Sequence, residues 1–112
     1  MLIRKREKPV HITFVKKITA DGEACRKCAD VEQRLRESGY WGCIDTVLVA
    51  DERNPDSAGV HMAAALGVDK APFFVVEDDA GGIAVHTIYF RFVREVLERM
   101  ERHAPVYETA CA

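Results

Sequence analysis

Residues 10–28 read VHITFVKKITADGEACRKC, and this stretch decides the fold of the chain. Its first half, Val10–Ile18, is rich in β-branched and aromatic residues, which predicts a strand. Turn-forming residues follow at 19–22, and the stretch ends on Cys25 and Cys28, a C-x-x-C pair where a helix should begin. Two thiols so near each other at the start of a helix indicate a candidate redox site.

The residues after the cysteine pair predict a helix and then a second strand. Apolar residues at three- and four-residue spacing (Cys28, Val31 and Leu35) predict an amphipathic helix over about 26–38 that ends at Gly39. The apolar run 44–50 predicts a strand. Because a helix joins the two strands, we expect them to be parallel with a right-handed crossover.

The rest of the chain predicts a second helix, a hairpin and a last helix. Asn54 and Pro55 suggest an N-cap and a first helical residue, and the helix continues over 60–66 to a stop at Gly67. Strands over 73–77 and 85–90 flank a short, turn-rich spacer and should pair antiparallel. A final apolar stripe predicts a helix over about 91–103.

Composition is typical of one small soluble domain. The chain has 112 residues, 48% hydrophobic, and its 16 Lys and Arg against 18 Asp and Glu give a net charge of -2. This balance gives no reason to expect nucleic acid or a membrane as a partner. Residues 1–6 carry charges where a signal peptide needs apolar residues, and no apolar window of about 18 residues occurs. The four cysteines do not resemble a secreted disulfide scaffold, so we expect a reducing, cytoplasmic location.

With the order β-α-β-α-β-β-α and a C-x-x-C between the first strand and the first helix, the chain resembles the thioredoxin-like superfamily in its glutaredoxin-sized form. Residues 66–73, LGVDKAPF, are similar to the segment in which that family reaches a cis-proline and its third strand. The resemblance implies an α/β thioredoxin-like fold, a four-stranded mixed sheet flanked by three helices. From the basic opening residues and the segment after Pro105 we expect a flexible N-terminal arm at 1–9 and a C-terminal tail at 105–112, on either side of a single domain at 10–104.

The resemblance also implies a role for each cysteine. Cys25, exposed at a helix N-terminus, is the expected nucleophile, because backbone N–H groups and the helix dipole favour a thiolate there. Cys28, one turn into the helix, is the expected resolving cysteine that attacks the mixed disulfide. Arg26 and Lys27 add positive charge that tunes the ionisation of the thiols.

Ala71 and Pro72 are the expected substrate-binding residues. In the family the cis-proline faces the cysteines, and the backbone of the residue before it pairs with an extended substrate. The function implied is a thiol–disulfide oxidoreductase that reduces or exchanges protein disulfides and takes electrons from an unidentified donor, with no cofactor. Phe90–Val93 stands where glutaredoxins carry a Gly-Gly turn, which argues against glutathione as a partner.

Other interpretations stay open. The chain could be a non-catalytic module that binds a partner or a metal through the same groove, or an accessory domain of a sulfur- or metal-handling enzyme. A zinc site would need further ligands from distant elements, so no metal is expected. Those ligands would come from His11, His61, Cys43 or Cys111. We expect Cys43 to be a buried small residue and Cys111 to be solvated.

Overall fold

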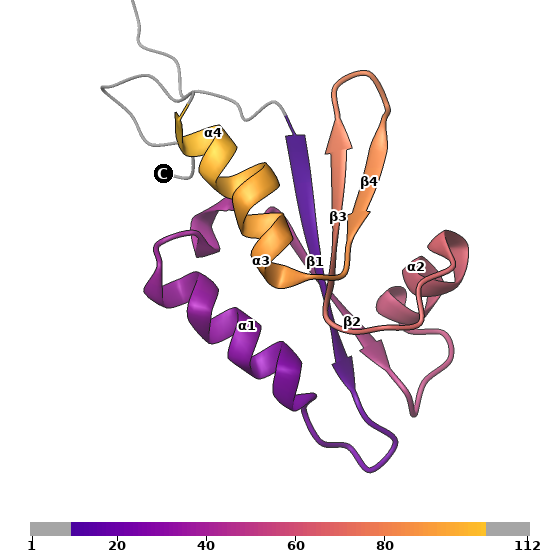
Figure 1. Ribbon diagram of the computed structural model, residues 1–112. Helices are drawn as coiled ribbons and strands as arrows, with labels where there is room; N and C mark the ends of the chain where they lie inside the picture. The colour runs from indigo at the N-terminus through magenta and orange to yellow at the C-terminus, as the bar shows by residue number, and fades with distance from the viewer. Residues whose placement is uncertain (1–9, 103–112) are drawn as a thin grey trace, which may run out of the picture.

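The computed structural model describes residues 10–102, which form an α/β architecture around a four-stranded mixed sheet (Figure 1). The strand order is β2-β1-β3-β4, with β1 parallel to β2, antiparallel to β3, and β3 antiparallel to β4. The predicted parallel pair and the predicted hairpin are therefore both confirmed. The strands are β1 (Val10–Ile18), β2 (Thr46–Asp51), β3 (Phe73–Asp78) and β4 (Ile83–His86).

Three helical segments flank the sheet. Helix α1 spans Arg26–Glu37 and α2 spans Ala58–Leu66. The C-terminal segment consists of α3 (Tyr89–Phe92), a π-helical turn (Val93–Leu97) and α4 (Glu98–Arg102). A short 3-10 turn (Trp41–Cys43) connects α1 to β2. The two predicted helix stops, Gly39 and Gly67, have φ of 84° and 68°, a left-handed conformation that glycine adopts without strain.

Several predicted boundaries are wrong, and two of them have a clear structural reason. The N-cap of α2 is Ser57 rather than Asn54, whose side chain and carbonyl accept hydrogen bonds from the next turn instead. β4 begins at Ile83, before the predicted start at Val85, and ends at His86, before the predicted end at Phe90. The reason is tertiary: the last β4 partner is Phe74, and β3 extends only one residue, Phe73, beyond it, so residues after Thr87 have no strand to pair with and form α3 despite their β propensity.

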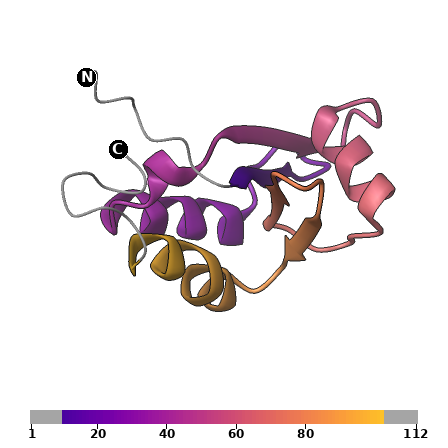
Figure 2. The same ribbon diagram turned by 90° about the horizontal axis from the view of Figure 1, so that it is seen from above.

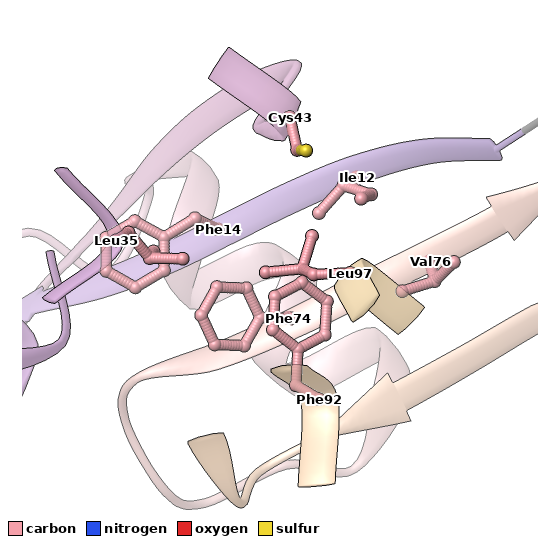
Figure 3. Packing of buried hydrophobic residues seen from close by; sticks show 8 residues of the cluster. All are labelled: Ile12, Phe14, Leu35, Cys43, Phe74, Val76, Phe92 and Leu97. Atoms are coloured by element: carbon pink, nitrogen blue, oxygen red, sulfur yellow. The ribbon is translucent and has the colours of Figure 1, made fainter. Parts of the chain in front are cut away.

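Side chains on successive strand residues alternate between the two faces of the sheet. On one face α1 and the C-terminal segment lie side by side and cover the main core, and α2 lies apart from both (Figure 2). Figure 3 shows this main core, in which residues from β1 and β3 meet the helices: Ile12, Phe14, Leu35, Cys43, Phe74, Val76, Phe92 and Leu97. On the other face α2 covers a smaller cluster of Val15, Phe73 and Val75.

An aromatic stack forms the centre of the main core. The ring centroids of Phe14 and Phe74 lie 5.1 Å apart, and those of Phe74 and Phe92 lie 3.9 Å apart. Trp41 contacts Phe14 edge-on at 6.0 Å. The stack joins β1, β3 and the C-terminal segment, so it holds the final helix on the sheet.

A glycine sets the distance between α2 and β2. A Cβ on Gly59 would lie 2.3 Å from the backbone nitrogen of Ala50, closer than any real contact. The helix can therefore approach the strand only because this residue has no side chain.

The predicted arm at 1–9 and tail at 105–112 lie outside the described residues. Within 10–102, none of the helices combines the length and the apolar character that a membrane span requires.

Candidate redox site

The backbone of Lys17, at the end of β1, contacts both cysteines. Its N–H donates to the Sγ of Cys28 over 3.4 Å, and its carbonyl accepts from the N–H of Cys25 over 3.0 Å. An isolated bridge between Ile18 and Ala24 adds a further link. The C-x-x-C pair is therefore anchored to the end of the central strand and does not depend on the loop at 19–22 for its position.

Cys25 is the N-cap of α1. It has extended backbone geometry (φ -60°, ψ 126°), and its Sγ accepts a hydrogen bond from the backbone N–H of Cys28 over 3.4 Å. The sulfur occupies the place of the oxygen in an ordinary capping residue, at the positive end of the helix dipole. Both cysteines are free thiols; Cys25 is partly exposed, and Cys28 is only 3% exposed.

Burial raises the pKa of the Cys28 thiol to about 12, and the hydrogen bond with Cys25 and the charge of Cys25 act in the same direction. The N–H and the positive charge of Lys17 oppose this shift, because both favour a thiolate. At neutral pH, Cys28 is therefore protonated and shielded, whereas Cys25 is the sulfur that a large reactant can reach.

Arg26 and Lys27 lie exposed on the first turn of α1, where no acidic residue is present. Cations at a helix N-terminus oppose the dipole and each cost the helix about 0.3–1 kcal/mol. An anion at the N-cap offsets this cost. The two cations and the helix end thus make the surroundings of the Cys25 sulfur electropositive.

Ala71 and Pro72 immediately precede β3 and are both half-buried. The peptide bond between them is cis, as the resemblance implies. Phe73, the next residue, pairs with Val15 on β1, two positions before Lys17. The strand register therefore brings Pro72 to the end of the sheet at which Lys17 holds the cysteines.

Glu52 is a residue of this site that the sequence did not predict. Its carboxylate accepts from the N–H of Ala20 over 3.0 Å and lies 3.5 Å from the Nζ of Lys17, and its own N–H donates to the carbonyl of Ile18 over 2.9 Å. Glu52 thus fastens the end of β1 to the end of β2. No local sequence signal marks it, because its partners are 32 or more residues away in the chain or are backbone groups.

The other candidate ligands do not converge on the cysteines. His11 bonds the hydroxyl of Thr46 over 2.9 Å, His61 faces Asp56 at 3.8 Å, and Cys43 is fully buried, as expected, in the main core. Among residues 10–102 no three His, Cys, Asp or Glu side chains are grouped so that they could hold a metal ion. Cys111 lies outside the described residues.

No protein-family model matches the chain, and no curated protein gives a significant match.

Proposed function

We propose that this protein is a cytoplasmic thiol–disulfide oxidoreductase of thioredoxin-like fold that reduces or exchanges protein disulfides through Cys25 and Cys28. The observation that carries the proposal is the pair of free thiols at the start of α1, one half-exposed as the N-cap and one buried beneath it. The element order, the mixed sheet and the position of Pro72 support the fold assignment.

The first step uses Cys25. Its thiolate attacks one sulfur of a substrate disulfide, the substrate S–S bond breaks, and the other substrate sulfur leaves as a thiolate that takes up a proton. The product is a mixed disulfide between Cys25 and the substrate. The Cys28 N–H at 3.4 Å and the cations Arg26 and Lys27 present positive charge to the sulfur that starts the attack.

The second step uses Cys28. Once it loses its proton, its sulfur attacks the Sγ of Cys25, the mixed disulfide breaks, and the second substrate thiol is released. The substrate has then gained two electrons, and the protein holds a Cys25–Cys28 disulfide that an external dithiol must reduce. With a pKa of about 12, the Cys28 thiol must lose its proton before it can attack. The hydrogen bond from the Lys17 N–H favours the thiolate form and so assists this step.

A turnover assay with a disulfide-containing protein substrate and dithiothreitol as the donor tests the proposal. The wild type is expected to accelerate reduction above the dithiothreitol background, and both Cys25→Ser and Cys28→Ser are expected to remain at background. The two isosteric variants control for each other: only Cys28→Ser, which keeps the nucleophile, should accumulate a mixed disulfide visible by intact mass.

A wild type that stays at background with every dithiol and protein substrate tried would contradict the proposal. A partner that remains bound to Cys25→Ser without any disulfide link would favour the non-catalytic binding module instead.

A further inference from the structure

Cys43 differs from the two cysteines of the redox site in the state of its sulfur. It lies in the 3-10 turn between α1 and β2, is fully buried in the main core, and takes part in a disulfide bond. Cys25 and Cys28 are free thiols, so neither is its partner. The chain has four cysteines, and the one that remains is Cys111.

The end of α4 lies next to the turn that holds Cys43. The hydroxyl of Tyr40, the N-cap of this turn, donates to the carboxylate of Glu101 over 3.2 Å. Leu97 belongs to the same buried cluster as Cys43 (Figure 3), and Met100 packs against that cluster. The chain therefore leaves α4 close to the bonded sulfur.

The segment after α4 is long enough to reach Cys43. Residues 103–110 separate Arg102, the last residue of α4, from Cys111. An extended chain advances about 3.5 Å per residue, so this segment spans up to about 30 Å. A disulfide requires the two Cα atoms to lie within about 7 Å of each other. Because α4 ends beside the Cys43 turn, the segment has more than the length that the bond requires.

We propose that Cys43 and Cys111 form a disulfide that fastens the C-terminal end of the chain to the main core. The bond encloses β2, α2, the hairpin and the C-terminal helical segment in one loop. A cross-link over so long a loop stabilises the fold because it restricts the unfolded chain. Cys43 follows the C-terminal end of α1 and Cys25 caps its N-terminal end, so this disulfide is separate from the candidate redox site.

Formation of the bond needs a two-electron acceptor, and a small-molecule disulfide is the class of oxidant that fits. The Cys111 thiolate attacks one sulfur of that disulfide, its S–S bond breaks, and the first small thiol leaves. The Cys43 thiolate then attacks the Cys111 sulfur, and the second small thiol leaves. The two protein thiols have lost two electrons and two protons, which the oxidant has gained. Because the Cys43 sulfur is buried, reducing thiols do not reach it, which is compatible with the cytoplasmic location proposed above.

A double variant, Cys25→Ser with Cys28→Ser, tests the bond without any contribution from the redox pair. It is purified without reductant, unfolded in urea and treated with iodoacetamide. We expect no labelling of Cys43 or Cys111, and peptide mapping without reductant should recover their two peptides joined together. After treatment with a phosphine reductant both cysteines should be labelled. Labelling of both without reductant, or a disulfide between two copies of the chain, would overturn the proposal.

Thermal melts in the same background measure the effect of the bond on stability. Cys111→Ser is expected to lower the Tm by roughly 10–20 °C, because the loop is no longer closed. Cys43→Ala should lower the Tm at least as much, since it also leaves a small cavity in the core. Adding Cys111→Ser to Cys43→Ala should cause no further loss, because the bond is already absent.

Thr109→Ser is the matched control for the melts. It changes a residue near Cys111 in the sequence without removing a sulfur, and it should melt like the background. An unchanged Tm for Cys111→Ser, or additive losses for Cys43→Ala and Cys111→Ser, would show that the two cysteines are not joined. Neither test depends on whether Cys25 and Cys28 exchange disulfides, because both are absent from the background.

Discussion

The backbone N–H of Lys17 lies 3.4 Å from the Sγ of Cys28 and donates a hydrogen bond to it. The contact comes from the main chain of β1, so it places the inner cysteine against the end of an interior strand of the sheet. Lys17 also accepts from the N–H of Cys25. One residue of β1 thereby bonds to both cysteines, and the chemistry of the pair follows from their different exposure.

The two thiols should differ strongly in reactivity. At neutral pH, iodoacetamide is expected to modify Cys25 and leave Cys28 unmodified, because a pKa of about 12 leaves only roughly one Cys28 thiol in 10⁵ ionised. Peptide mapping by mass spectrometry after a short exposure measures the site. Cys25→Ser should take up no rapid label in this segment, and rapid labelling of Cys28 in the folded wild type would contradict the burial described here.

Stability of the reduced protein should fall at alkaline pH. In the unfolded chain the Cys28 thiol ionises near its ordinary value of about 8.5, whereas in the folded chain its pKa is about 12. Between these values the folded state holds a proton that the unfolded state has lost. The stabilisation is complete below the unfolded pKa and is lost as the pH rises towards the folded pKa, at up to about 1.4 kcal/mol per pH unit.

Urea denaturation of the reduced protein measures this loss of stability. It is carried out from about pH 8 to about pH 11, the range set by the two pKa values. Tyr40 and Tyr89 complicate the result, because burial raises the pKa of both phenols and contributes in the same direction. Cys28→Ser keeps both tyrosines and removes only the thiol. Its stability should decline less steeply than that of the wild type, and equal slopes would mean that Cys28 does not contribute.

Gly59→Ala should destabilise the protein. Alanine favours a helix over glycine by about 1 kcal/mol, so helix propensity alone predicts a more stable variant. The added methyl would meet the backbone of Val49 and Ala50 within 2.6 Å and force α2 away from β2, which we expect to cost about 1–3 kcal/mol net. Ala64→Gly, on the exposed side of the same helix, is the control and should lose only about 1 kcal/mol. Thermal melts compare the variants, and a rise in Tm for Gly59→Ala would show that no close approach exists.

Phe92 and Phe90 should respond differently to the same substitution. Phe92 is fully buried and stacks on Phe74 at 3.9 Å, so Phe92→Ala is expected to cost about 3–5 kcal/mol. Phe90 is 65% exposed, with Arg34 at 5.9 Å from its ring, so Phe90→Ala should cost about 1 kcal/mol or less. Chemical denaturation of the two variants gives both values. Similar losses would contradict the assignment of the two side chains to opposite environments.

Much of the fold could be predicted because its signals are local. The β-branched run at 10–18, the helical stripe through Cys28 and Leu35, and glycines at 39 and 67 mark elements whose type depends on neighbouring residues alone. The position of Cys25 at the helix start is also a local property, and the structure bears it out in the N-cap geometry.

Features that depend on distant residues could not be predicted. Ser57 rather than Asn54 caps α2, and its hydroxyl accepts a hydrogen bond from the N–H of Asp51 on β2. β4 ends at His86, where β3 extends only one residue, Phe73, past the last paired position. Glu52 gives no sequence signal because its partners include backbone groups, which are the same whatever the residue type.

The sequence by itself therefore determined the order of strands and helices and the placement of two thiols at a helix start, since propensity and periodicity act over a few residues. Only the tertiary structure decided how those thiols differ. The raised pKa of Cys28 comes from its burial and from the hydrogen bond and charge of Cys25. The cation that opposes this shift is Lys17 on β1, eleven residues before Cys28 in the chain. Burial and Coulomb interactions act through space, so a sequence pattern records them only where the fold brings distant segments together.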